Sequence, residues 1–146
     1  MQFPRRPVLW MFAIVLATPV TAVELHPVEV RTGTVGLASV PLSVTNAAAA
    51  PITCVGELAH WYSTDLAHAG PGVIARIPLW LDPATGTYTV LNDKRENMPV
   101  EALWCGVDGM AYATRSAIAL ERRAGTVPDA LAVTCVATDA GGLDCE

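Results

Sequence analysis

The chain has 146 residues, of which 52% are hydrophobic and 16% charged, with a formal net charge of −5. This length suits a single domain behind an N-terminal leader. The acidic balance argues against a protein that binds nucleic acid or anionic lipid headgroups.

The first 22 residues have the three-part pattern of a secretory signal peptide. Arg5 and Arg6 precede an unbroken apolar run, VLWMFAIVLA, and the segment ends in small residues at Ala22. A membrane anchor needs about 18 to 20 apolar residues, and this run is shorter and is followed by Pro19. The pattern predicts cleavage after Ala22, a periplasmic or secreted location, and no stable membrane insertion of the mature chain.

Cleavage would make the chain more acidic. The leader holds two arginines and no acid, so residues 23–146 carry 7 Lys and Arg against 14 Asp and Glu, a formal charge of −7. We expect this part to fold as one disulfide-bonded β domain.

The N-terminal part of the mature chain has a high β-strand propensity. Short segments at residues 28–30, 35–46 and 52–55 are rich in valine and are separated by Gly, Pro or the sequence NAAAAP. Residues 56–72, GELAHWYSTDLAHAGPG, allow two interpretations: a strand that runs into a short helical turn, or a helix that ends at the Gly-Pro-Gly sequence. Both stay open at this point.

Residues 73–92 predict a β-hairpin. Apolar residues occupy the odd positions of VIARIPLWLD, residues 73–82. This period of two is typical of a half-buried strand, in which Pro78 marks an edge or a bulge. The loop DPATG and the β-branched segment TYTVLN follow, and this order favours a hairpin.

A second hairpin is predicted around the turn sequence Asp108-Gly109. Residues 111–123 also contain helix-forming alanines, but Tyr112, Ile118 and Leu120 share one strand parity, which favours a strand. Residues 131–138, LAVTCVAT, alternate again. About eight short strands at such spacing predict an all-β fold, a small antiparallel sandwich or barrel.

The four cysteines predict two disulfides. Cys54, Cys105, Cys135 and Cys145 all follow the leader, and an even count in a small exported chain indicates bridges. Three pairings are open; we favour Cys54–Cys105 and Cys135–Cys145, because Gly141-Gly142 can fold the last segment back as a hairpin. No C-x-x-C pair is present, which argues against structural zinc and thioredoxin-like redox sites.

The order Cys54, Trp61 or Trp80, Cys105 is similar to that of immunoglobulin domains, in which two bridged cysteines accompany a buried tryptophan. Leu103 stands two residues before the second cysteine, where that pattern has a tyrosine. The resemblance implies an immunoglobulin-like architecture and no particular function.

The residues that suggest chemistry do not form a motif. His60 and His68 are residue types that bind copper or zinc, yet no H-x-H or H-x-x-x-H pair is present. Ser63, His60 and Asp65 resemble a hydrolase triad only in composition, since triads are assembled from separate segments. We therefore expect no catalytic or cofactor-binding residues.

The aromatic residues favour binding of a partner protein over catalysis. Trp104, beside a cysteine, is expected in the core, whereas Trp61-Tyr62 and Trp80 are candidates for an exposed partner surface. The charged segment 92–97 is expected to be a solvated loop. We expect an exported, non-catalytic interaction or accessory protein with an unknown protein partner, for which β-edge pairing is one binding mode. The alternative is a periplasmic or extracellular copper- or zinc-binding protein that uses His60 or His68.

Overall fold

The computed structural model describes residues 30–59 and 62–146. The predicted signal peptide, His60 and Trp61 lie outside these residues. The described part contains strands and irregular segments, and none of it is a helix long and apolar enough to cross a membrane. The all-β prediction is confirmed.

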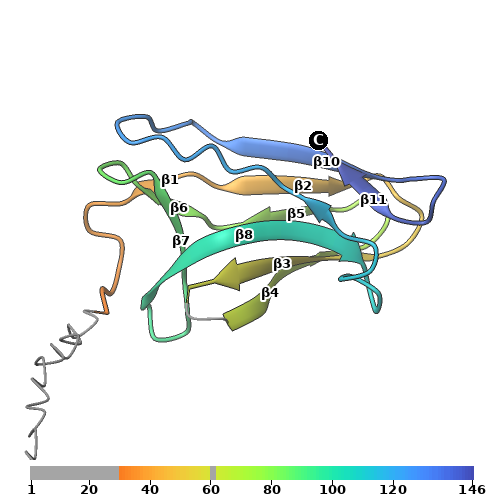
Figure 1. The fold of residues 1–146 in the computed structure, drawn as a ribbon, viewed down its shortest axis with the longest axis horizontal. Coiled ribbons are helices and arrows are strands. Elements are labelled where there is room, and N and C mark those ends of the chain that lie inside the picture. The colour runs from red at the N-terminus through yellow and green to blue at the C-terminus, as the bar shows by residue number, and fades with distance from the viewer. Residues whose placement is uncertain (1–29, 60–61) are drawn as a thin grey trace, which may run out of the picture.

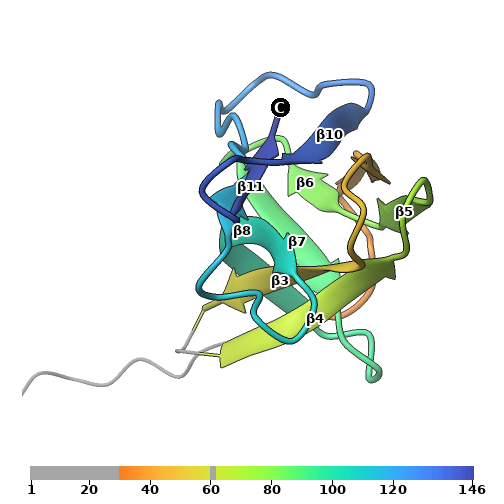
Figure 2. The ribbon, with the colours of Figure 1, turned by 90° about the vertical axis from the view of Figure 1, so that its right-hand side faces the viewer.

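Two sheets form a sandwich (Figures 1 and 2). The larger runs β1-β6-β7-β8-β3-β4, with β9 also paired to β8, and the smaller runs β11-β10-β2-β5. The strands of the described residues are β1 (Ala38–Ser39), β2 (Leu42–Asn46), β3 (Ile52–Leu58), β4 (Tyr62–Ala69), β5 (Ile74–Ile77), β6 (Trp80–Asp82), β7 (Thr87–Leu91), β8 (Asn97–Val107), β9 (Ser116–Ala117), β10 (Leu131–Ala137) and β11 (Leu143–Cys145).

The smaller sheet is mixed, so one of its pairs departs from the antiparallel pattern that the sequence predicts. β10 pairs with β2 in parallel, while its other neighbour, β11, is antiparallel. β2 and β10 are distant in sequence, so their pairing depends on how the intervening chain folds and leaves no local signal.

The predicted strand at residues 73–82 is two strands that belong to different sheets. β5 pairs with β2 in the smaller sheet, and β6 pairs with β1 in the larger. The two pairs follow one continuous register. Continued through the residues between the strands, this register places Pro41 opposite Pro78. Neither proline can donate a ladder hydrogen bond, so the two-stranded ribbon turns there from one sheet into the other.

The alternation predicted for this segment holds from Ala75 to Leu81 and fails only at Val73. Ile77, Leu79 and Leu81 are at most 1% exposed, whereas Val73 is 49% exposed and lies before the strand begins. The hairpin prediction is confirmed, because β6 and β7 pair through a turn in which the Gly86 amide donates to the Asp82 carbonyl oxygen at 2.8 Å.

The second predicted hairpin is present but shorter. β9 holds only Ser116 and Ala117 opposite β8, and residues 111–114 form turns instead of the expected strand. These turns lie directly on Gly106, where an added Cβ would overlap the Ala111 backbone. Because Gly106 has no side chain, the loop can fold onto the sheet there.

Within residues 56–59 and 62–72, the described part of this segment, the chain forms strands and a turn and not a helix. β3 continues to Leu58, and β4 runs from Tyr62 to Ala69 as its antiparallel partner. The register shifts between Cys54 and Val55, so that Leu66 of β4 has no direct partner on β3. This bulge re-aims the side chains of β4.

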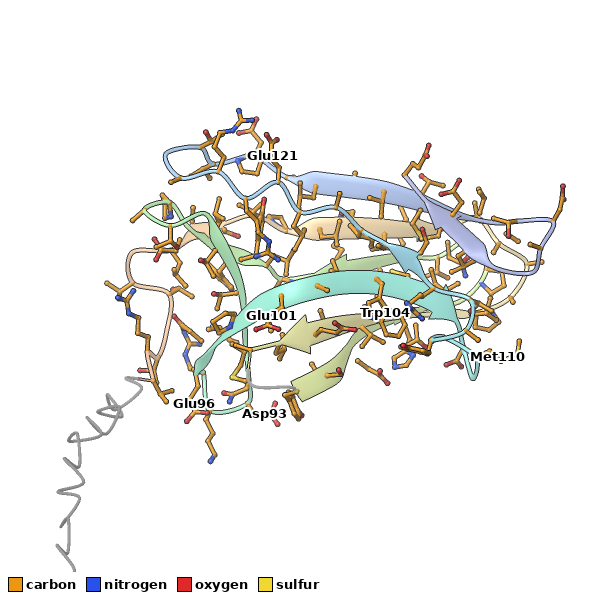
Figure 3. The ribbon with its side chains drawn as sticks, viewed as in Figure 1. Asp93, Glu96, Glu101, Trp104, Met110 and Glu121 are labelled. Carbon is orange, nitrogen blue, oxygen red and sulfur yellow. A yellow bond between two sulfur atoms is a disulfide. The ribbon has the colours of Figure 1, made fainter. Side chains whose placement is uncertain are left out.

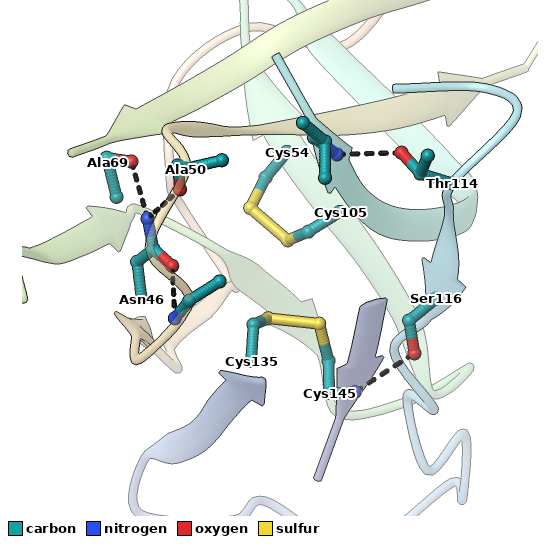
Figure 4. The surroundings of a disulfide bond; sticks show 11 residues. Asn46, Ala50, Cys54, Ala69, Cys105, Thr114, Ser116, Cys135 and Cys145 are labelled. Atoms are coloured by element: carbon teal, nitrogen blue, oxygen red, sulfur yellow. Dashed lines mark hydrogen bonds between the residues drawn. A yellow bond between two sulfur atoms is a disulfide. The ribbon is translucent and has the colours of Figure 1, made fainter. Parts of the chain in front are cut away.

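The predicted pairing of the cysteines is confirmed. Cys54–Cys105 joins directly opposite residues of β3 and β8, and Cys135–Cys145 joins directly opposite residues of β10 and β11. Each bridge stays within one sheet, whereas the immunoglobulin bridge connects two sheets. Figure 4 shows the two bridges facing each other across the core.

Candidate functional site

The two sheets are joined where β4 ends. The Asn46 side chain is fully buried, and its amide nitrogen donates to the carbonyl oxygens of Ala50 and Ala69, each at 2.9 Å. Its Oδ1 accepts from the Ala48 amide at 2.9 Å (Figure 4). The Gly72 amide also donates to the Asn46 carbonyl oxygen at 2.8 Å. These bonds anchor the turn between β4 and β5.

Away from this turn, β4 and β5 separate (Figure 2). The space between them is a groove of about 590 Å³, here called the seam groove. That volume is in the range of sites that bind small ligands or a few side chains. The seam groove is lined mainly by apolar residues, namely Leu58, Leu66, Ile77, Pro78, Trp80, Val90, Leu91 and Met98, together with Tyr62, Thr64, Asp65, Asn92 and Asp93.

An open strand edge borders the seam groove. Within the described residues, β4 pairs only with β3. Alternate residues of such an edge strand direct their N–H and C=O groups away from the sheet, where another extended chain can pair with them. The stretch from Tyr62 to Leu66 lies along the groove, so the backbone groups and the apolar floor are adjacent.

The shape of the groove depends on Leu66 and Gly56. A Cβ added at Gly56 would lie 2.8 Å from the Leu66 Cδ1 atom. Because glycine leaves this space, the bulged Leu66 side chain lies on β3 and covers the core from the groove side. Leu66 is half-buried and packs against the buried core.

Two of the three predicted surface aromatics line this groove. Tyr62 is 56% exposed, and Trp80 is half-buried; both line the groove although they are distant in sequence. Trp61 lies outside the described residues. Trp104 is buried as predicted, but on the outer face of the larger sheet, where its ring packs edge-on against Tyr112 and its Nε1 donates to Glu57 at 3.3 Å.

The rim of the groove is acidic. Its described lining includes Asp65 and Asp93, both exposed, and neither lysine nor arginine. Asp93 belongs to the loop between β7 and β8, close to Glu96 (Figure 3). Asn92 orders this loop, since its Oδ1 accepts from the Lys94 amide at 3.0 Å and from the Glu96 amide at 2.9 Å. The predicted solvated loop is thus a structured turn that presents an acid at the groove.

His68 is held by a buried hydroxyl beside this rim. The Thr53 hydroxyl donates to Asp108 Oδ1 at 2.7 Å and lies 3.0 Å from His68 Nδ1. Because the hydroxyl has only one hydrogen, Nδ1 is the donor in the second contact. The Nε2 atom of the exposed ring then lies 3.8 Å from Asp65 Oδ2.

Thr53, His68 and Asp108 have the residue types of a catalytic triad, but the hydroxyl donates its hydrogen bond to the carboxylate and not to the histidine. A nucleophilic hydroxyl must give its proton to the histidine, whereas Thr53 gives its proton to Asp108 and is 4% exposed. The arrangement orients His68 and does not activate Thr53. No pattern in the sequence points to this arrangement, because Thr53 and Asp108 are common residue types 55 positions apart.

No family model, curated protein or solved structure matches this chain.

Proposed function

We propose that the protein is an exported, non-catalytic interaction protein that binds an extended segment of a partner protein at the seam groove. The observation that carries this proposal is the open edge of β4 directly beside an apolar groove. Edge pairing supplies affinity through main-chain hydrogen bonds, and adjacent pockets select the side chains. The five residues from Tyr62 to Leu66 would accommodate a strand of roughly 16 Å.

The chemistry of the groove defines the partner. Apolar side chains of the partner segment would enter between Leu66 and Trp80, both of which line the groove. Lysine or arginine at the ends of that segment would approach Asp65 and Asp93. Charge complementarity of this kind contributes mainly to the association rate and to specificity, so the binding should weaken as salt is raised.

Export remains part of the proposal. The leader pattern of residues 1–22 supports it, and the two disulfides are compatible with an oxidising, exported compartment. Residues 23–146 would then meet the partner outside the cytoplasm.

A fluorescent peptide tests the binding mode. The probe alternates valine and threonine over six residues and has a lysine at each end; a second probe has glutamates in place of the lysines. We expect fluorescence anisotropy to show binding of the lysine probe and at least tenfold weaker binding of the glutamate probe. A third probe with proline at alternate positions removes the main-chain donors and should not bind.

Matched variants locate the binding. Leu66→Lys places a charge in the groove and should abolish binding, whereas Val136→Lys, at a 45% exposed position on β10, should not. Asp65→Lys together with Asp93→Lys should reverse the preference between the two charged probes. The proposal fails if neither charged probe binds, or if Leu66→Lys and Val136→Lys behave alike.

A second candidate function is binding of copper or zinc at His68. The observation in its favour is the hydrogen bond that fixes Nδ1 and leaves Nε2 facing Asp65, since metal-binding histidines usually donate their other ring N–H to a fixed partner. Equilibrium dialysis with Cu²⁺ and Zn²⁺ tests it. Micromolar or tighter uptake that is lost in His68→Ala, and weakened in Thr53→Val, would favour metal binding; uptake unchanged by His68→Ala would exclude this site, and His60→Ala tests the other histidine.

A further inference from the structure

The two disulfides meet in the core, although they belong to different sheets. The sulfur atoms of Cys105, Cys135 and Cys145 all lie within 4.8 Å of one another. Cys105 is bonded to Cys54, and Cys135 is bonded to Cys145. The atoms of one bridge are therefore neighbours of an atom of the other (Figure 4).

The four cysteines differ in access to solvent. Cys145 is 7% exposed, whereas Cys54, Cys105 and Cys135 are at most 1% exposed. Cys145 belongs to β11, which forms an edge of the smaller sheet. The Cys135–Cys145 bridge therefore contains the most exposed of the four cysteine residues, and access is one of the factors that set exchange rates.

We propose that the two bridges form one thiol–disulfide exchange unit, which is entered at Cys145 and connected through Cys105. In the first step a thiolate of an external dithiol attacks Cys145 Sγ, and Cys135 leaves as a thiolate. The second thiol of the reductant then displaces Cys145 and leaves as a cyclic disulfide. Together the two displacements reduce the Cys135–Cys145 pair by two electrons.

The next step passes the electrons inward. The Cys135 thiolate attacks Cys105 Sγ, the Cys54–Cys105 bond breaks, and Cys54 leaves as a thiolate that takes up a proton. The Cys145 thiolate then attacks Cys135, restores the Cys135–Cys145 bond and releases Cys105. In sum, two electrons and two protons move from the external dithiol to the Cys54–Cys105 pair.

A variant with a single free thiol tests the connection. In Cys145→Ser the native bridge Cys54–Cys105 leaves the thiol on Cys135. After incubation at pH 8, acid quenching, alkylation and peptide mapping by mass spectrometry, we expect the label to shift from Cys135 alone to both Cys135 and Cys54. The shift reports the new bridge Cys105–Cys135.

The pairing pattern separates exchange in the folded protein from exchange after unfolding. Cys54 is not one of the three clustered sulfurs, so the pair Cys54–Cys135 should not form in the fold; incubation in urea supplies the scrambled reference that contains it. A label fixed on Cys135 would overturn the proposal. The appearance of all three pairings without urea would also overturn it.

A second variant keeps the test decisive if Cys145→Ser folds poorly. Cys54→Ser leaves the thiol on Cys105 beside an intact Cys135–Cys145 bridge. The same experiment should find the label on Cys105 and also on Cys135 or Cys145. A label confined to Cys105 would contradict the connection. Near-ultraviolet circular dichroism of each variant, compared with the parent protein, establishes that the fold is retained.

Discussion

The two long sides of the sandwich differ in how the sheets meet. On the joined side, β11 lies against the segment at residues 114–116: the Leu143 amide donates to the Thr114 carbonyl oxygen at 2.9 Å, and the Cys145 amide donates to Ser116 Oγ at 3.0 Å. On the open side, the Asn46 side chain of β2 donates to the Ala69 carbonyl oxygen at the end of β4, and beyond this point the two sheets separate around the seam groove.

This difference shows how one small domain can combine a closed core with a free edge. Unpaired edges invite aggregation, and proteins protect them with charges and bulges. β4 has both, because Asp65 is exposed and Leu66 forms the bulge. The joined side carries the two disulfides, and the open side carries the site that we propose for a partner.

The largest expected effect comes from removing the disulfides. Replacing Cys54 and Cys105 by alanine should lower the free energy of unfolding by about 4 kcal/mol, and replacing Cys135 and Cys145 by about 3 kcal/mol, because the longer loop restricts the unfolded chain more. The sequence separations are 51 and 10 residues. Urea unfolding measures both. A larger loss for the Cys135–Cys145 pair would contradict the loop-entropy reason.

The next effect comes from removing the Asn46 side chain, which anchors the turn on the open side. Asn46→Ala leaves the buried Ala69 carbonyl oxygen, the partly buried Ala50 carbonyl oxygen and the Ala48 amide without their partner, and we expect a loss of about 3 kcal/mol in unfolding free energy. Asn97→Ala is the matched control, since its amide makes a single bond, to the Gly33 carbonyl oxygen, and should lose about 1 kcal/mol. Equal losses would show that Asn46 is no special anchor.

A smaller effect concerns the loop on the outer face near the joined side. Gly106→Ala would force the backbone at Ala111 away from β8, and we expect a loss of about 2 kcal/mol. Gly70→Ala, at the turn of the open side, meets only the Val73 side chain at 3.8 Å and should change stability by less than about 0.5 kcal/mol. Thermal unfolding of the two variants compares the sides directly.

The smallest effect on stability at neutral pH is expected from a substitution at Tyr88, in the core between the two sides. Tyr88 is fully buried, and its hydroxyl has no hydrogen-bond partner among the described residues. Tyr88→Phe removes this unpaired group, so we expect unfolding free energy at pH 7 to stay equal or rise by up to about 1 kcal/mol. A clear loss would mean that the hydroxyl has a partner.

The same variant gives a pH signature. Burial raises the pKa of Tyr88 above its ordinary value of 10.0, against the opposing charge of Arg122. The folded state therefore keeps the proton that the unfolded state loses above pH 10, and stability falls as pH rises, by at most about 1.4 kcal/mol per pH unit. Below pH 10 this contribution is constant. Urea titrations from pH 8 to 11 should show that the Phe variant loses less stability than the parent protein.

The sequence by itself determined the β class and the β6–β7 hairpin, and among three possible cysteine pairings it favoured the one that the structure has. The class and the hairpin depend on residues close in sequence, such as the period of two in VIARIPLWLD. Of the two bridges, only Cys135–Cys145, 10 residues apart, has a spacing that suits a hairpin, whereas Cys54–Cys105 spans 51 residues. The sequence also selected Tyr62 and Trp80 as candidates for an exposed surface. It did not reveal that Pro78 lies opposite Pro41 and moves the strand to the other sheet.

Only the tertiary structure decided which of these features meet. The parallel pairing of β2 with β10, the approach of the two disulfides and the seam groove all join segments distant in sequence. The short strand at Ser116–Ala117 likewise follows from packing against β8 and β11 and not from its own alternation. Alternation and turn residues specify local strands, whereas contacts between sheets depend on how the twisted strands pack, which no local pattern encodes.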